Sequence, residues 1–120
     1  MATASGAARD LAPDVFDPRC PSRTLLDHVT SRWGVLILIA LSDGTMRWSE
    51  IRRLVKGITE KMLASTLRTL EADGLVVRVA HPVSPPHVDY SLTDKGRDLT
   101  LLLRPLVDWV TTNADGRSGS

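Results

Sequence analysis

The stretch that decides the fold is TEKMLASTLRTLEADG, residues 59–74, because it carries every signal of an amphipathic helix. Leu63, Leu67 and Leu70 recur at spacings of four and three residues, so they form one apolar stripe along a helix. Thr59 stands where a helix N-cap is expected, and Gly74 stands where a helix stops. The polar side of this predicted helix then carries Lys61, Ala64, Ser65 and Arg68.

Two helices are predicted towards the start of the chain. A proline opens residues 21–30 and suits a first helical position, which places Cys20 at or next to the helix cap. The apolar run VLILIAL, residues 35–41, lies between the cap candidate Ser31 and an Asp-Gly stop at 43–44. That length favours a buried helix over a strand. The run is far shorter than the about 20 residues that a membrane span needs.

A short helix and a tight turn are predicted immediately before the quoted stretch. In RWSEIRRLVKG, residues 47–57, we expect Ser49 to cap the helix and Gly57 to end it. The connection KGIT then leads directly into the next helix. The two helices therefore form a helix-turn-helix pair.

After the quoted stretch the pattern changes to that of strands. LVVRVAH, residues 75–81, and HVDYSL, residues 87–92, are short and rich in β-branched residues, and apolar and polar side chains alternate in the second. The connector PVSPP, residues 82–86, is stiff because three of its residues are prolines. These features predict a β-hairpin with a long tip.

The last predicted helix begins at the cap Thr93 and carries more apolar surface than a small chain can bury. Pro105 is expected to bend or interrupt it, because proline lacks the backbone donor of the helix ladder. A second copy of the chain is the simplest cover for such a face. The apolar stripe comprises Leu99, Leu102, Leu103, Leu106, Trp109 and Val110.

Composition is that of an ordinary globular protein of one domain. Of 120 residues, 42% are apolar and 24% charged, and the formal net charge of +1 gives no indication about nucleic acid. One cysteine excludes an intrachain disulfide and multi-cysteine metal sites, and fits a reducing cytosol. Without a recognisable signal peptide or membrane span, we expect a cytoplasmic protein. Residues 1–17 are expected to be a flexible arm, 18–112 the domain, and 113–120 a disordered tail.

The order of elements, helices followed by a hairpin and a final helix, is the layout of a winged helix-turn-helix. The expected fold class is mainly α with a small β-hairpin, an α+β arrangement. The helix after the turn then enters the DNA major groove, and the hairpin lies over the adjacent backbone or minor groove. From Arg47 to Arg68, six basic residues outnumber two acidic ones, a net charge of +4 that suits phosphate contact. The competing interpretation is that these charges are solvated helix faces.

Two stretches resemble the HxlR family of bacterial transcription regulators, relatives of the MarR type. They are WGVLILIALSDGTMRWSEIRRLVKGITEKMLASTLRTLEADGLVVR, residues 33–78, and PPHVDYSLTDKG, residues 85–96. Glu60 stands where many members have proline, and Trp48 replaces a more usual phenylalanine. The resemblance implies a homodimer that binds a palindromic operator in double-stranded DNA, and terminal helices that form the dimer interface. Residues expected in that interface are Leu25, Leu26, Val29, Leu99, Leu102, Leu103, Leu106 and Trp109.

The helix after the turn supplies the expected groove contacts. Lys61, Ser65 and Arg68 are the first candidates, and Thr59 and Thr66 are lesser ones, since Thr59 competes as a cap. Arg68 reaches either a phosphate or a guanine edge, and both remain open. Contacts to the DNA backbone from the first helix of the pair and from the wing are expected at Arg47, Arg52, Arg53, Arg78, His81 and His87.

Cys20 is the candidate sensor, and two mechanisms remain open. In the first, the helix N-terminus and the neighbouring Arg19 and Arg23 favour the thiolate, which an oxidant or electrophile modifies to release a repressor from DNA. In the second, Cys20 is structural and a small apolar effector binds at the dimer interface. The resemblance favours the first, because some family members sense oxidants through a cysteine near the start of the first helix.

No catalytic residue, cofactor or metal is expected. The sequence holds no P-loop, GxGxxG, HExxH or Ser-His-Asp order. Cys20 and His28 resemble a nucleophile and its base, but they stand about two helical turns apart, so a cysteine-dependent enzyme is a remote alternative. His81 and His87 flank the hairpin tip, yet no third strong metal ligand is apparent beside them.

Overall fold

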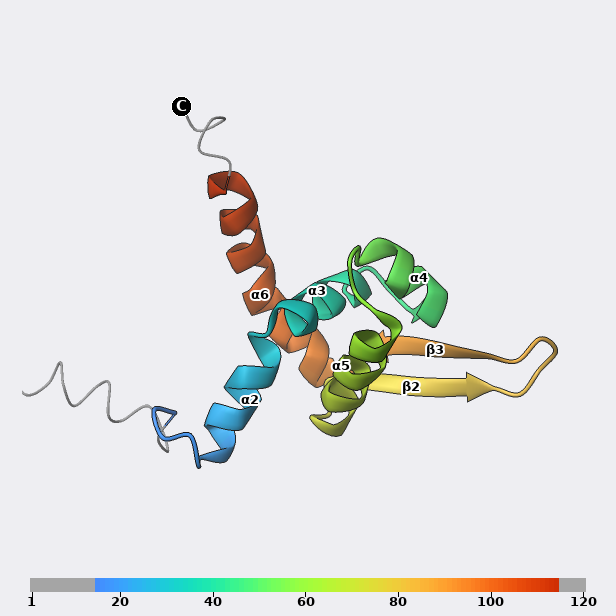
Figure 1. The fold of residues 1–120 in the computed structure, drawn as a ribbon, viewed down its shortest axis with the longest axis horizontal. Helices are drawn as coiled ribbons and strands as arrows, with labels where there is room; N and C mark the ends of the chain where they lie inside the picture. Colours follow the sequence, from blue (N-terminus) through green and yellow to red (C-terminus); the bar gives the residue numbers. More distant parts are fainter. Residues whose placement is uncertain (1–14, 115–120) are drawn as a thin grey trace, which may run out of the picture. The chain divides into compact units, whose positions relative to one another are not determined.

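The computed structural model describes residues 15–114, which form five helices and three strands (Figure 1). The chain divides into two compact units, residues 1–31 and 32–120. Residues 1–14 of the expected arm and 115–120 of the expected tail lie outside the described residues. No single helix within 15–114 is long and apolar enough to span a membrane, and only α2 with α3 meets the length and composition as a pair.

In the described part of the first unit, residues 15–31, there is one helix, α2, Pro21–Val29. It begins where the sequence predicts, with Cys20 as the N-cap in an extended conformation (φ −78°, ψ 136°). Proline suits the first position because the amide that it lacks would have no partner inside the helix. Thr30 closes the helix, since its backbone N–H and its hydroxyl both donate to the carbonyl of Leu26, at 3.0 and 2.6 Å.

The second unit is built around α3, Arg32–Leu41, the helix that contains the apolar run. It packs against α4 (Trp48–Leu54), α5 (Glu60–Ala72) and α6 (Asp94–Asn113). Its apolar residues face neighbours on several sides, which is why the helix shows no polar stripe. The largest fully buried side chains are Ile37, Leu38, Leu41, Ile51, Leu63, Leu70 and Leu75.

Helix α4 begins two residues earlier than the sequence predicts. Its N-cap is Arg47 and its first residue is Trp48, so the predicted cap at Ser49 is wrong. The reason is that the Glu50 carboxylate accepts the Arg47 N–H at 2.7 Å, and Arg47 itself ends a strand. Gly57 lies in the turn that follows, with φ +90°, a conformation that strongly favours glycine.

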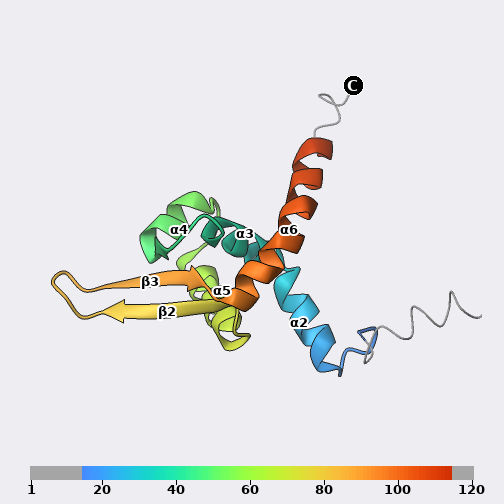
Figure 2. The same cartoon turned by 180° about the vertical axis from the view of Figure 1, so that it is seen from behind.

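The sheet has three strands rather than the two of a hairpin. β2 (Val76–His81) and β3 (His87–Leu92) pair antiparallel, as predicted. The strand that the sequence did not reveal, β1 (Met46–Arg47), pairs with the other edge of β3. Figures 1 and 2 show the β2–β3 hairpin extending beyond α4 and α5, as the wing of a winged helix does.

Helix α6 is continuous from Asp94 to Asn113, so Pro105 does not interrupt it, and one residue of the expected tail is helical. The predicted cap is confirmed, because the Thr93 hydroxyl accepts the Gly96 N–H at 3.0 Å. Gly96, Thr100 and Leu103 are the buried residues of this helix. They follow one another at spacings of four and three residues and form the face of α6 that packs against the rest of the second unit.

Candidate nucleic-acid interface

Helix α5 presents the predicted contact residues on its exposed side. Lys61, Ser65 and Arg68 are exposed, whereas Leu63, Leu67 and Leu70 are buried on the other side. Thr66 is half-buried. The cap at Thr59 is confirmed, because its hydroxyl accepts the Met62 N–H at 3.1 Å, although the residue remains exposed.

The cations of this surface differ in whether they already have partners. Lys61, Arg68 and Arg53 make no hydrogen bond or ion pair with any residue in the part of the chain that the structure describes, so their charges are available to a ligand. Arg52 differs, because its guanidinium lies 3.3 Å from the Glu60 carboxylate and thereby links α4 to α5. Such an exposed pair is worth about 0–1 kcal/mol, so a DNA phosphate can displace Glu60 at little cost.

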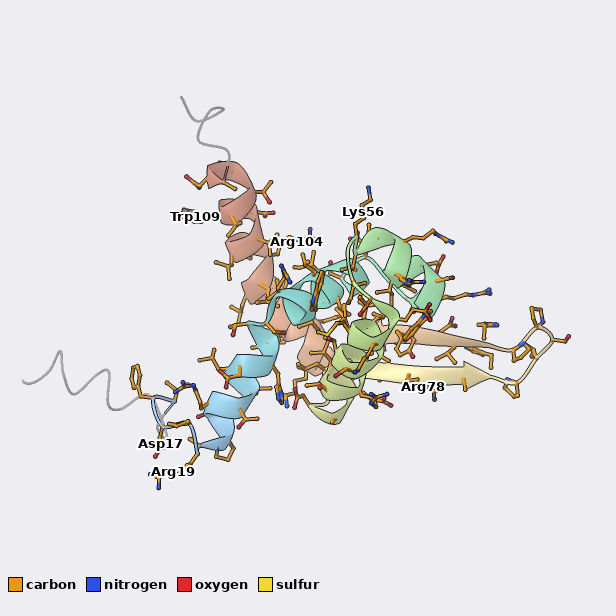
Figure 3. The ribbon with its side chains drawn as sticks, in the orientation of Figure 1. Asp17, Arg19, Lys56, Arg78, Arg104 and Trp109 are labelled. Carbon is orange, nitrogen blue, oxygen red and sulfur yellow. The ribbon has the colours of Figure 1, made fainter. Side chains whose placement is uncertain are left out.

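A hollow of about 380 Å³ separates α5 from the sheet and brings cations of the helix and the wing together. Arg68 of α5 and Arg78 of β2 both line it, with Glu71 as the only acid in its lining. Figure 3 shows Arg78 on β2, where the strand leaves the body of the unit. The wing and the helix therefore offer positive charge to one ligand, as a groove-bound duplex requires.

A second hollow, of about 470 Å³, lies beside α4 and the turn that follows it. Arg52, Arg53 and Lys56 line it, together with Trp48. Lys56 extends from the end of α4 towards solvent in Figure 3. Lys56 is one of the six basic residues counted from Arg47 to Arg68 but is not among the DNA contacts expected from the sequence, because its position beside two arginines depends on where α4 ends.

The wing histidines lie opposite each other, at the end of β2 and the start of β3. Their rings stack with centroids 4.7 Å apart, and both are half-buried. Nε2 of His81 lies 2.9 Å from an oxygen of Asp89, and Nε2 of His87 lies 3.9 Å from the other oxygen. Each ring thus turns a nitrogen towards Asp89, a residue that sequence reasoning overlooked.

Cys20 is half-buried at the start of α2, and its Sγ lies 3.1 Å from the Ser22 hydroxyl. It therefore stands at the positive end of the helix, as the sequence predicts. A hydroxyl at that distance is suited to donate to a thiolate.

Arg19 and Arg23, the two arginines expected to favour the thiolate, each pair with an acidic residue of the same segment. Arg19 donates to the Asp17 carboxylate at 3.1 and 2.8 Å, and this contact holds the pKa of Asp17 below its ordinary value. Arg23 lies 3.6 Å from Asp27 and donates to a backbone carbonyl. Of the three expected causes of thiolate formation, the helix N-terminus is the one with the clearest geometry.

The C-terminal helix has a second, exposed apolar face. Leu102, Leu106 and Trp109 are 71%, 52% and 64% exposed and follow at spacings of four and three residues. Leu99 continues this face and is half-buried. Leu103 is buried within its own protomer and offers little surface to another chain. Among the expected interface residues of α2, Leu26 is exposed, Leu25 half-buried and Val29 buried.

One apolar hollow bears on the effector alternative. It measures about 260 Å³ and lies between α3, α4 and α6, with Leu36 and Leu54 as exposed apolar residues on its lining. Arg104 borders it and donates to the Ser42 hydroxyl at 2.9 Å.

Comparison with known proteins points to one family. The family model described as HxlR-like helix-turn-helix matches residues 28–118. The HTH-type transcriptional regulator YtfH of Escherichia coli K12 is 53% identical over 100 residues, 83% of this chain and 79% of that protein. The solved transcriptional regulator ytfH from Salmonella typhimurium has a TM-score of 0.81 at 51% identity and covers 88% of this chain and 95% of its own. The redox regulator HypR in its oxidized form has a TM-score of 0.71 at 38% identity, over 78% and 96% of the two chains.

Proposed function

Since the chain belongs to the HxlR-like helix-turn-helix family and is a transcriptional regulator of the winged-helix type, we propose that it binds a palindromic operator as a homodimer and represses transcription. The observation that carries the proposal is the joint exposure of Lys61 and Arg68 on α5 with Arg78 on β2. Arg68 and Arg78 line one hollow and Lys61 is exposed on the same helix as Arg68, an arrangement of positive charge that suits the closely spaced phosphates of a duplex. In this mode α5 lies in the major groove and the wing covers the neighbouring backbone.

The proposed contacts to one DNA half-site come from different elements of the chain. Lys61, Ser65 and Arg68 face the groove, and Thr66 is placed behind them because it is half-buried. Backbone contacts come from Arg47, Arg52, Arg53 and Lys56 on the α4 side, and from Arg78 on the wing. His81 and His87 are less suited to this role, since their nitrogens face Asp89.

Replacing Lys61 with alanine is expected to weaken binding to all DNA sequences alike. Lys61 is exposed and has no intramolecular partner within residues 15–114, so its loss removes one phosphate contact and leaves the core unchanged. The slope of log affinity against log salt should fall by about one. Fluorescence anisotropy with the chain's own upstream DNA, at four salt concentrations, measures both quantities.

Lys95 provides a matched control. Lys61 is the second residue of α5 and Lys95 the second residue of α6, so both substitutions remove one lysine from a first helical turn. Lys95→Ala also removes a hydrogen bond from Lys95 to the backbone carbonyl of Asp73, at 3.1 Å, but it should leave the salt slope unchanged. Equal loss in the two variants would contradict the proposed DNA face, and failure of the unaltered protein to bind at moderate salt would contradict the function itself. A reporter gene under the same promoter distinguishes repression from activation.

The exposed face of α6 supports the dimer. Leu99, Leu102, Leu106 and Trp109 alternate three- and four-residue steps, the spacing of a helix seam that packs against another helix. Two copies joined through this face present two α5 helices, as half-sites about 34 Å apart require. Leu25 and Leu26 of α2 are proposed as further interface residues.

A thiol mechanism is proposed for release from DNA. The similarity to HypR, which is a redox regulator, supports it, and so does the position of Cys20 at the N-terminus of α2. Two Cys20 thiols lose two electrons and two protons to an oxidant such as diamide and form one S–S bond between subunits. Alternatively, one Cys20 thiol and one small thiol lose two electrons and two protons to the same oxidant and form a mixed disulfide. Either product changes the start of the first helix, which is itself proposed to contribute residues to the dimer interface.

Diamide is expected to weaken operator binding by unmodified protein on the order of tenfold or more, as for a typical allosteric coupling. Cys20→Ser removes the sulfur and should bind equally well with and without diamide. Band shift with both proteins measures the effect, and dithiothreitol should reverse it. A serine variant that loses DNA as readily as the unmodified protein would show that Cys20 is structural.

A further inference from the structure

We propose that His81, His87 and Asp89 bind one divalent transition-metal ion of the Zn²⁺ type on the wing. One ligand atom from each of these residues lies within 4.8 Å of the other two. Two imidazoles and one carboxylate are a common set of three protein ligands for such an ion. The site is separate from α5 and Cys20, so the proposal goes beyond the DNA-binding function.

The distances are close to those of a bound ion. Metal bonds of about 2.1 Å in a tetrahedral site place the ligand atoms about 3.4 Å apart. The observed values are 2.9 Å from His81 to Asp89 and 3.9 Å from His87 to the same carboxylate, which bracket that separation. The two distances end on different oxygens of Asp89, and one ligand atom from each of the three residues lies within 4.8 Å of the others, so a bound ion would draw the three atoms closer together.

Strand pairing holds the ligands in place. His81 and His87 are directly opposite across β2 and β3, so both side chains leave the same face of the sheet. Asp89 stands two residues after His87 in β3 and therefore shares that face. Stacking of the two rings, at 4.7 Å and 25° between planes, already aligns the imidazoles.

The direction of the Asp89 carboxylate is a second observation that favours a cation there. Arg47 of β1 is the register partner of Asp89 on the other side, and an arginine is a natural partner for a carboxylate. Among the described residues, however, the ion pairs of Asp89 are with His81 and His87 and not with Arg47. The oxygens thus converge with the two imidazole nitrogens.

The chemistry of the ligands selects the metal. Imidazole nitrogen suits Zn²⁺, Ni²⁺ and Cu²⁺, whereas Mg²⁺ and Ca²⁺ prefer oxygen ligands throughout. Three protein ligands leave a fourth position for water, and the half-buried side chains keep it open to solvent. On binding, each imidazole gives a nitrogen lone pair to the ion, and a nitrogen that carries a proton releases it to water.

The test measures metal binding without DNA, on full-length protein from which any affinity tag has been removed. Calorimetry with ZnCl₂ should give one ion per chain, and Co²⁺ should produce visible absorption bands that Zn²⁺ abolishes. His87→Ala and Asp89→Asn should each weaken Zn²⁺ binding by about 100-fold or more, since even changes to residues behind the ligands cost about 10–100-fold. MgCl₂ should give no binding signal.

His28 is the matched control, because it is the one histidine of the three in the chain that is not a proposed ligand, and it lies on α2. His28→Ala should bind Zn²⁺ as the unmodified protein does, and NMR should show imidazole shifts at His81 and His87 alone. Equal loss in His28→Ala and His87→Ala, or unchanged binding by Asp89→Asn, would overturn the proposal. Absence of stoichiometric binding would do the same and would leave the three residues as a contact between strands.

Discussion

Replacing Gly96 with alanine is expected to lower the melting temperature by about 10 °C or more. A Cβ at this position would overlap the carbonyl oxygen of Leu75 and would lie 3.2 Å from a methyl group of Leu92. The carbonyl belongs to the backbone and accepts the Thr93 N–H at 3.0 Å, so it cannot turn away. Overpacking of this kind costs about 3 kcal/mol or more, and each kcal/mol lowers the melting temperature of a domain of this size by about 4–8 °C.

The direction of the change in melting temperature distinguishes overpacking from helix propensity. Helix propensity alone predicts that alanine stabilises an interior helical position by about 1 kcal/mol relative to glycine. Asp98→Ala, at an exposed position of the same helix, shows what propensity contributes without the overlap. Thermal unfolding at one fixed protomer concentration measures both variants, because a dimer's melting temperature depends on concentration. A Gly96→Ala variant as stable as Asp98→Ala would contradict the close packing of α6 on the turn before β2.

Trp109→Glu is expected to weaken the proposed dimer by about thirtyfold or more, because loss of an aromatic anchor from an interface can cost about 2 kcal/mol or more. Trp109 is 64% exposed on α6, and Figure 3 shows it on the half of the helix that extends from the unit. A charge there must be desolvated when two copies meet, whereas it remains hydrated in the monomer. Sedimentation velocity over a concentration series measures the dissociation constant.

Thr111→Glu is the control for this change. It adds the same charge at the same end of α6, but about 200° further round the helix at about 100° per residue. Thr111→Glu should dimerise as strongly as the unmodified protein. At concentrations low enough for both variants to be monomeric, their melting temperatures should agree within a few degrees. If Trp109→Glu stays dimeric, the exposed face of α6 is not the interface. If it becomes monomeric, its affinity for the full operator should fall while half-site binding persists.

The helices were predictable because their signals are local. Thr59 and Thr93 cap α5 and α6 through their own side chains, and Gly74 ends α5 with φ +77°, so a few neighbouring residues decide each boundary. The exception is α4. Ser49 is a residue type that favours the N-cap position, but the N-cap of this helix is Arg47. There the strand before the helix decides its start, and that strand exists only through pairing with β3.

The remaining features depend on contacts between distant residues. β1 has two residues, too few for any alternation to show, so no sequence period could reveal it. Leu102 and Leu103 are equally apolar, yet one is exposed and the other buried, because only packing on α3 decides which face of α6 turns inward. The two-residue spacing places Asp89 on the face of His87, but His81 joins them only through hairpin register, which spacing along the chain does not specify.

The two-residue strand β1 has a consequence for how the protein would choose among operators. Met46 pairs with Tyr90 in the wing, and Arg47 pairs with Asp89 and is bonded directly to the first residue of α4. Strand pairing and the direct connection to α4 therefore hold the wing and the helix-turn-helix in a fixed relative position. In the proposed mode of binding, each subunit then accepts a single offset between its two contact points on DNA. A half-site that needs a different offset between the wing contact and the helix contact would then bind poorly. A change in the length of the spacer between half-sites would instead be accommodated by movement at the proposed interface between the two copies.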